Sequence, residues 1–302
     1  MQKEELFDVI IVGGSYAGLS AAMALGRSLK NVLIIDSGKP CNRQTPHSHN
    51  FLTRDGETPA NLAAISKAQV SAYPTLKFLD GLAESAKKTG NGFSITTADQ
   101  QIFNAKKLII AAGVKDIFPS IKGFAECWGI SVLHCPYCHG YEVKGKATGV
   151  IANGEIGFEF TKLISNWTKD LTLFTNGATD INPDDQAKLF TKNINIVEKE
   201  IEEIIHQNGI VKYLKFKDGS NQKLDAIYAR VGVEHNTKII TDLNIELSEQ
   251  GYIAINTFKQ TNVAGVYAAG DCTTMMRSVA SSVADGNSAG AILNKELVSE
   301  AF

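Results

Sequence analysis

The sequence predicts an α/β protein made of two Rossmann-like, three-layer dinucleotide-binding domains, of which the first is discontinuous. Glycine-rich turns at 13–18 and 152–157 each stand between a predicted strand and a predicted helix. The late segment 263–298 resembles the end of a dinucleotide fold, so we expect it to return to the first domain. A chain of 302 residues is long enough for two domains of ordinary size.

The composition excludes several classes of partner. Hydrophobic residues make up 44% of the chain, charged residues 21%, and the net charge is −2, which gives no electrostatic reason to bind nucleic acid or an anionic membrane. No apolar run approaches the roughly 18 residues of a membrane span, and the N-terminus lacks the pattern of a signal peptide. We therefore expect a cytoplasmic protein with neither nucleic acid nor membrane as a partner.

The first glycine turn has the context of a nucleotide site. An apolar β-branched run at 9–12 precedes it, and helical periodicity follows at 19–25. The turn reads G-G-S-Y-A-G, close to the G-x-G-x-x-G fingerprint. The strand at 32–35 ends in an acid near the roughly 20-residue offset at which such a residue binds a ribose hydroxyl. The predicted adenine dinucleotide site comprises Gly13, Gly14, Ser15, Ala17, Gly18 and Asp36.

The segment 38–56 is polar and rich in turn residues, as expected of a loop that wraps a ligand, although an ordinary surface loop has the same composition. Arg43, His47 and His49 favour contact with an anionic or flat ligand. The next elements expected are a helix at 59–73 and strands at 76–79, 93–97 and 107–112.

The stretch 134–142 carries the chemistry we predict. Cys135 and Cys138 are two residues apart, so they can close a disulfide within one turn and exchange two electrons as a pair. The same spacing is found in half of a zinc site, and His134 and His139 flank it. These four residues are too crowded in sequence to close a tetrahedron, and there is no second C-x-x-C. We therefore expect no metal.

The second glycine turn is less complete. A strand at 147–152 leads into A-N-G-E-I-G, and a helix is expected at 158–167. The following strand, 171–174, ends in Thr175-Asn176-Gly177, which offers neither an acid for a ribose diol nor an arginine for a 2′-phosphate. NADH or NADPH is therefore a doubtful cofactor.

The rest of the chain divides between the two domains. Strands expected at 194–197, 201–205, 211–216 and 224–229 complete the second domain. Strands at 251–256 and 263–271 and a helix at 278–298 complete the first. The predicted boundaries are 1–114 and 244–302 for the first domain and 115–243 for the second, which carries the C-x-x-C motif.

Four landmarks in this order resemble one family: 13–18, the C-x-x-C before a second βαβ unit, V-G-V-E-H-N-T at 231–237, and G-V-Y-A-A-G-D at 265–271. The chain resembles the low-molecular-weight thioredoxin reductase-like FAD-dependent pyridine nucleotide-disulfide oxidoreductases over nearly its whole length. Its C-x-x-C-H-G-Y-E motif resembles the subgroup that contains the gliotoxin and holomycin dithiol oxidases.

The resemblance implies a homodimer with one FAD per subunit in the first domain. The first turn and Asp36 would hold the adenosine and pyrophosphate, and the cysteine pair would exchange electrons with the flavin, Cys138 nearer to it and Cys135 facing the substrate. Further FAD contacts implied by the resemblance are Asn50, Ala112, Gly113, Gly270, Asp271 and Val279.

Three departures from the family pattern affect the predicted function. His139 stands where thioredoxin reductases have a proton-donating Asp, and a histidine with a pKa of roughly 6.5 can stabilise a thiolate and move its proton. We therefore predict Cys135, Cys138 and His139 as the catalytic residues. The basic motif for the NADPH 2′-phosphate corresponds to 175–177 here, and the Arg-Gln pair before the last helix corresponds to Ser278-Val279.

The predicted function is that of an FAD-dependent thiol-disulfide oxidoreductase that does not use NADPH. Its substrate is a dithiol or disulfide, either a small molecule or a thioredoxin-like protein. It could oxidise dithiols with O₂, or reduce disulfides with electrons from another donor such as ferredoxin. The alternatives are an NADPH-dependent thioredoxin reductase and a non-catalytic flavin-binding protein. Cys41, Cys127 and Cys272 are expected to be small core residues.

Overall fold

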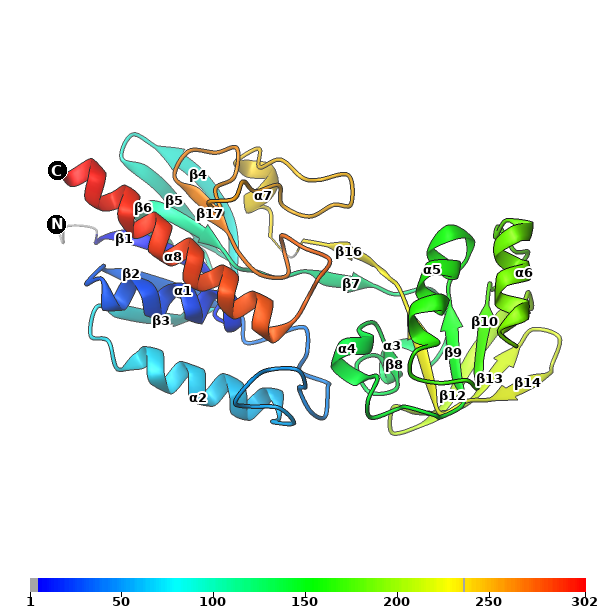
Figure 1. Ribbon diagram of the computed structural model, residues 1–302. Helices are drawn as coiled ribbons and strands as arrows, with labels where there is room; N and C mark the ends of the chain where they lie inside the picture. Colours follow the sequence, from blue (N-terminus) through cyan, green and yellow to red (C-terminus); the bar gives the residue numbers. More distant parts are fainter. Residues whose placement is uncertain (1–4, 236) are drawn as a thin grey trace. The chain divides into compact units, whose positions relative to one another are not determined.

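The computed structural model describes residues 5–235 and 237–302, and it confirms the predicted α/β fold class. The chain forms two compact units (Figure 1). Unit 1 contains residues 5–43, 51–115 and 233–302, and unit 2 contains residues 44–50 and 116–232. Asn236, part of the landmark at 231–237, lies outside the described residues. No helix in the described ranges is long and apolar enough to cross a membrane.

The sheet of unit 1 is formed by β1 (Leu6–Val12), β2 (Val32–Asp36), β3 (Leu76–Asp80), β4 (Ala83–Thr89), β5 (Gly92–Thr97), β6 (Ile102–Ile110) and β17 (Val266–Ala268). Its strand order is β3-β2-β1-β6-β5-β4, and β17 also pairs with β6. Because β1 pairs in parallel with both β2 and β6, the strand order reverses beside β1. Open α/β sheets bind their ligands at the carboxyl ends of the strands at such a point.

One face of this sheet is covered by α1 (Tyr16–Arg27), α2 (Pro59–Ser71) and α8 (Val279–Ala301), which share a buried core with the sheet (Figure 1). Helix α8 packs directly on α1 because small residues face each other. A Cβ on Gly286 would lie 2.0 Å from the carbonyl oxygen of Ala17, and one on Gly290 would lie 2.6 Å from that of Ala21. This close packing brings the end of the chain against the helix that follows the first glycine turn.

The other face of the sheet corrects one predicted boundary. The short helix α7 (Ile239–Asp242) packs against β4, and Ile239, Ile240 and Leu243 belong to the buried core of unit 1. Residues 233–243 therefore belong to unit 1, although we predicted that the second domain extends to 243. The error arose because an apolar run in sequence does not reveal which sheet it covers.

Two other elements differ from the sequence prediction. No strand forms at 251–256, where Ile253 makes only an isolated bridge to Leu247. Conversely, β4 was not predicted, because A-E-S-A-K-K-T is too polar to read as a strand. It forms an edge strand paired with β5 on one side only, where such residues are tolerated.

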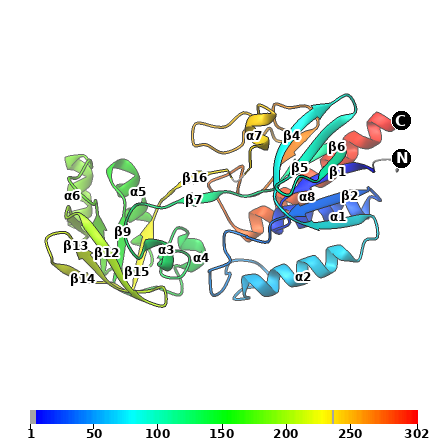
Figure 2. The same ribbon diagram turned by 180° about the vertical axis from the view of Figure 1, so that it is seen from behind.

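Unit 2 has three layers (Figure 2). Its parallel sheet has the order β11-β10-β9-β15-β8 and is formed by β8 (Val132–Leu133), β9 (Thr148–Ile151), β10 (Leu171–Phe174), β11 (Asn195–Val197) and β15 (Ala226–Ala229). One face packs on α5 (Gly154–Ile164) and α6 (Pro183–Thr191). The other packs on an antiparallel sheet of β12 (Ile201–Gln207), β13 (Ile210–Phe216) and β14 (Asn221–Lys223).

Two further segments complete the described elements. The chain passes between the units in β7 (Lys115–Ile117) and β16 (Gly232–Glu234), which pair with each other. The short helix α3 (Phe124–Cys127) lies within unit 2 and contributes Phe124 and Cys127 to its core.

The close contact between α1 and α8 predicts that adding a single methyl group to α8 destabilises the protein. Gly286→Ala places a methyl group where the Ala17 carbonyl lies, so the helices must separate, and we expect a loss of about 1–3 kcal/mol in the free energy of unfolding. Asn287→Ala, on the exposed side of the same helix, should change it by less than about 0.5 kcal/mol. Denaturant unfolding of both variants checks this, and equal effects would contradict the packing.

Candidate active site

Cys135 and Cys138 form a disulfide at the start of the short helix α4 (Pro136–His139), with their Cα atoms 5.3 Å apart. Cys135 is the N-cap residue, and Pro136 occupies the first turn, where its restricted φ suits a helix. The N–H of Gly140 donates to the carbonyl of Pro136 at 2.7 Å. A Cβ on Gly140 would lie 2.4 Å from that oxygen, so the turn after the cysteines requires glycine. In the part of the chain described, no group of three or more His, Cys, Asp or Glu could hold a metal ion.

The imidazole of His139 is largely removed from water. Burial lowers its pKa to about 4, the nearby Glu142 raises it in part, and His49 lowers it further. This corrects the expectation of a histidinium with an ordinary pKa, because at neutral pH the ring carries no charge. A neutral imidazole can accept a proton but cannot stabilise a thiolate by charge. The same lowered pKa also makes the ring a weak base toward a thiol, so His139 can bind a proton only transiently.

Glu142 is held from the other side by the segment 44–50, which belongs to unit 2. Nε2 of His49 lies 3.6 Å from Oε1 of Glu142, so this part of the predicted ligand-wrapping loop lies beside the redox motif. Asn50, predicted as an FAD contact, ends the same segment with a positive φ of 60°. Its role at the cofactor stays a prediction.

Aromatic side chains surround the motif. The ring of His134 stacks on Trp128 with centroids 5.7 Å apart, which places it against the aromatic core of unit 2. Tyr137, between the two cysteines, is 57% exposed and meets the Trp167 ring edge-on at 5.7 Å. Tyr137 is therefore an exposed aromatic group of the motif, as is Tyr141.

The first glycine turn is built for close approach. Gly13 has a φ of +102°, and a Cβ there would lie 2.3 Å from the carbonyl oxygen of Ala111, at the end of β6. A Cβ on Gly18 would lie 1.8 Å from the Gly13 carbonyl, and one on Gly14 would lie 2.8 Å from Cβ of Asp36. The side chain of the N-cap residue, Ser15, makes no capping hydrogen bond. The first amides of α1 are thus left without a side-chain cap.

The other predicted cofactor residues of unit 1 gather around the same helix. A Cβ on Gly270 would lie 2.8 Å from Cβ of Ala17, so the strand end before Asp271 lies against α1. Asp271 accepts a hydrogen bond from Ser282 Oγ at 3.2 Å and lies 3.6 Å from Nε of Arg277. Ala112 and Gly113 follow β6, and Val279 begins α8. The tertiary structure of unit 1 therefore brings Ala112 to the first glycine turn and Gly270 and Asp271 to the helix that follows it.

The second glycine turn is closed by its own side chain. Asn153 is the N-cap residue of α5, and its Oδ1 accepts from Gly154 N at 2.8 Å and from Asp180 N at 2.9 Å. Its Nδ2 donates to the carbonyl of Ala178 at 2.9 Å. One amide thus joins the turn after β9 to the loop after β10, the two segments that hold a dinucleotide in a Rossmann unit.

The loop after β10 is also poorly suited to an anionic ligand, because it carries an acid and its Asn176 is already hydrogen-bonded within the protein. Asp180 places its Cβ 3.9 Å from a Cβ position on Gly154, so a carboxylate side chain stands beside the start of α5. Asn176 is used internally, since its Oδ1 accepts from the N–H of Ile201 at 2.7 Å. The absence of anchors seen in the sequence is thus accompanied by a closed turn.

The three cysteines outside the motif differ from one another. Burial raises the pKa of Cys127 to about 11 and that of Cys272 to about 12, as expected of small core residues. Cys41 does not fit that expectation, because it is exposed and its thiol donates to Oδ2 of Asp271 at 3.4 Å. Cys41 lies in a loop and not in a helix or strand, so no hydrophobic periodicity in the sequence indicated whether it is buried.

The chain belongs to the pyridine nucleotide-disulphide oxidoreductase family, whose model matches residues 7–286. It is an enzyme of this class, a thioredoxin reductase-like disulfide oxidoreductase with a redox-active disulfide. The predicted resemblance is thereby confirmed.

Among its relatives, a thioredoxin reductase of Claviceps purpurea is 30% identical, with 99% of this chain and 97% of that protein aligned. The crystal structure of an oxidoreductase from Agrobacterium tumefaciens is 35% identical, covers 97% of this chain and 99% of its own, and superimposes with a TM-score of 0.91. The crystal structure of HlmI is 28% identical, covers 100% of this chain and 95% of its own, and has a TM-score of 0.93.

Thioredoxin reductase-like members of this family bind FAD, and unit 1 fits that cofactor. The glycines let the turn pack closely against β6 and Asp36, and the start of α1, which has no side-chain cap, presents amides that can bind a pyrophosphate. The residues that would hold FAD are those of the first turn together with two acids, Asp36 and Asp271, which would contact different parts of the cofactor. Their individual roles stay predictions.

Sequence reasoning missed the function of Asn153. An Asn directly before a helical pattern is a common N-cap, so its capping could have been predicted. Its bonds to Ala178 and Asp180 could not, because they depend on how two loops meet. The pairing of Glu142 with His49, far apart in sequence, was missed for the same reason.

The lowered pKa of His139 makes the stability of the folded protein depend on pH. In the unfolded chain the ring titrates near 6.5 and in the folded chain near 4, so between these values the unfolded state binds more protons. The free energy of unfolding should therefore fall as the pH is lowered through this window, by up to about 3 kcal/mol. His139→Gln should lose less stability than the wild type between pH ~7 and ~4.5 in urea unfolding. Parallel losses would show that the ring is not buried as described.

Proposed function

We propose that this protein oxidises dithiols through the Cys135–Cys138 disulfide, with FAD as cofactor and without a nicotinamide cofactor. The observation that carries the proposal is the contrast between the two glycine turns: Ser15 leaves α1 uncapped, whereas Asn153 caps α5 and ties the turn to Ala178 and Asp180. A pyrophosphate at the second turn would have to displace the Asn153 side chain from Gly154 N beside the acidic Asp180.

The cysteine pair accepts two electrons from the substrate. A substrate thiolate attacks Cys135 Sγ, the bond between the two cysteines breaks, and Cys138 leaves as a thiolate. The second substrate thiol then attacks the substrate sulfur of the mixed disulfide and releases Cys135. The substrate has become a disulfide and the enzyme a dithiol, so the electrons balance. The assignment of Cys135 as the attacked sulfur follows the family resemblance.

His139 handles the proton in this exchange. A substrate thiol near an ordinary pKa of about 8.5 is mostly protonated at neutral pH, and only its thiolate is a nucleophile. The buried imidazole is a weak base, so in this scheme it takes that proton only transiently and passes it on. Glu142 raises the pKa of His139 in part, and so favours the proton once it is bound.

FAD, when bound, supplies a two-electron acceptor for the reduced pair, and the net reaction we propose is dithiol plus O₂ giving disulfide plus hydrogen peroxide. We further propose that the enzyme acts as a homodimer in the cytoplasm. A reducing compartment suits Cys127 and Cys272, which form no disulfide.

The choice of electron donor can be tested with the purified flavoprotein under anaerobic conditions. We expect dithiothreitol to bleach the visible flavin band and neither NADPH nor NADH to do so, because the second turn is closed. Rapid, stoichiometric bleaching by NADPH would instead identify an NADPH-dependent thioredoxin reductase. A flavin that no reagent bleaches would identify a non-catalytic flavin-binding protein.

The path of the electrons can be tested with one substitution. Cys138→Ser should retain FAD but lose dithiol-driven bleaching, because no disulfide remains to accept the electrons. Cys127→Ala serves as the matched control, since this buried thiol forms no disulfide. Stopped-flow absorbance measures both variants. Wild-type rates in Cys138→Ser would mean that the electrons do not pass through the pair.

A further inference from the structure

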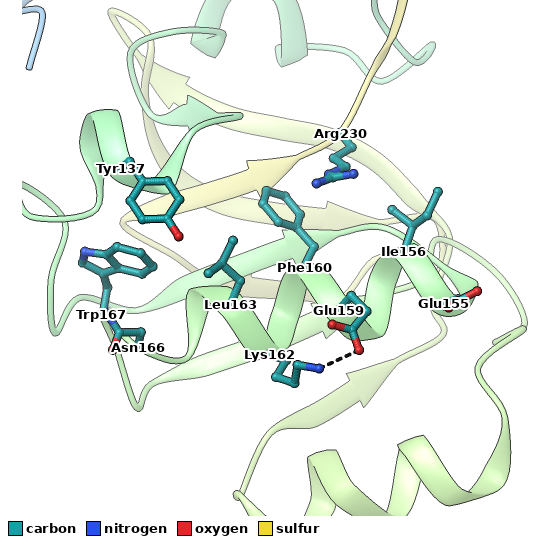
Figure 3. A pocket seen from close by; sticks show the side chains of 10 residues that line it. All are labelled: Tyr137, Glu155, Ile156, Glu159, Phe160, Lys162, Leu163, Asn166, Trp167 and Arg230. Atoms are coloured by element: carbon teal, nitrogen blue, oxygen red, sulfur yellow. Dashed lines mark hydrogen bonds and ion pairs between the residues drawn. The ribbon is translucent and has the colours of Figure 1, made fainter. Parts of the chain in front are cut away.

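A pocket of about 780 Å³ opens along helix α5 in unit 2, beside the redox motif (Figure 3). Tyr137 and Trp167 line one end, Arg230 and Ile156 line the other, and Phe160 and Leu163 line the wall between them. Its volume falls within the range of roughly 300–1,000 Å³ typical of small-molecule sites. Helix positions 156 and 163 are seven residues apart, so they are separated by about 10 Å along the helix axis.

Arg230 stands where a ligand is expected in such a unit. It directly follows β15, and β15 and β10 flank β9 on its two sides, so the strand order of unit 2 reverses there. Ligands of open α/β sheets bind at the carboxyl ends of the strands at this point. Because Asn153 closes the dinucleotide turn, the open space at this position lies along α5 and contains Arg230.

The charge of Arg230 is not neutralised by the protein. Its guanidinium lies over the Phe160 ring at 5.2 Å, and in the part of the chain described it makes neither an ion pair nor a hydrogen bond. The two acids of the pocket do not pair with it: Glu159 binds Lys162 at 2.6 Å, and Glu155 forms no ion pair with Arg230. A guanidinium whose donors are open and whose face rests on an aromatic ring is suited to a carboxylate.

The other end of the pocket is lined by a residue of the redox motif. Tyr137 lies between the two cysteines in the chain and meets Trp167 edge-on across the pocket end. Neither cysteine lines the pocket, so it would hold the body of a substrate while the substrate's sulfur atoms reach the disulfide. The apolar wall between Tyr137 and Arg230 suits a hydrocarbon segment.

We propose that this pocket binds the dithiol substrate, and that the substrate is a small molecule with an apolar body and a carboxylate that Arg230 recognises. The inference rests on the proposed function and narrows its substrate from any dithiol to an anionic, largely apolar one. Arg230 is a specificity-determining residue in this scheme, and it takes no part in the exchange of sulfur bonds.

Dihydrolipoate and dihydrolipoamide form a matched pair of probes, because they share one dithiol and one hydrocarbon chain and differ only in a carboxylate or a neutral amide. With the holoenzyme, we expect the KM for dihydrolipoate to be about tenfold lower than for dihydrolipoamide. A tenfold ratio corresponds to the binding free energy that one charge-assisted hydrogen bond typically contributes. In Arg230→Gln this ratio should fall to about one. In Lys192→Gln, which removes an exposed cation from the same unit, the ratio should remain.

The outcomes separate this inference from the proposed function. Equal KM values in the wild type, or a tenfold preference that survives in Arg230→Gln, would overturn the pocket assignment even where dithiothreitol reduces the flavin. So would reduced thioredoxin, if it were oxidised far more efficiently than either probe. If dithiothreitol fails to bleach the flavin, the proposed function fails. Binding of oxidised lipoate and lipoamide, followed by calorimetry, then tests the pocket alone, and equal affinities would refute it.

Discussion

A helix that follows a parallel strand begins with amides that have no partner inside the helix, and something must satisfy them. The two units of this protein resolve that constraint in opposite ways. In unit 1 the Ser15 side chain makes no cap and the start of α1 is open to an anion, whereas in unit 2 the Asn153 amide caps α5 and binds the neighbouring loop. The proposed use of FAD without a nicotinamide depends on this difference.

The open turn is maintained by close packing. Gly13 and Gly18 let β1, β6 and α1 approach to distances that exclude any side chain, and Gly286 brings α8 against α1. Gly270, the neighbour of Asp271, is thereby packed against Ala17 of α1, although it lies more than two hundred residues from Gly13 in the chain. Packing of backbone against backbone therefore shapes the cofactor site of unit 1.

Unit 2 has the architecture of a nucleotide-binding domain, but different side chains occupy the place of a nucleotide. Its closed turn leaves the space along α5 to Arg230 and an apolar wall, and the disulfide lies at the start of α4, whose Tyr137 lines that space. The motif also differs electrostatically from a simple thiolate site. Burial keeps His139 uncharged and makes it a weak base. Glu142, which lies 3.6 Å from Nε2 of His49, raises the pKa of His139 in part.

The sequence by itself determined the fold class, the two glycine turns, the cysteine pair and the doubtful nicotinamide site, because these depend on periodicity, turn residues and spacing along the chain. It did not reveal that residues 239–243 pack in unit 1, that Cys41 is exposed beside Asp271, or that His139 is uncharged. Nor did it indicate the bonds of Asn153 or the position of Arg230 over Phe160. Only the tertiary structure decided these features, because burial, charge pairing and loop contacts arise between residues that are distant in sequence.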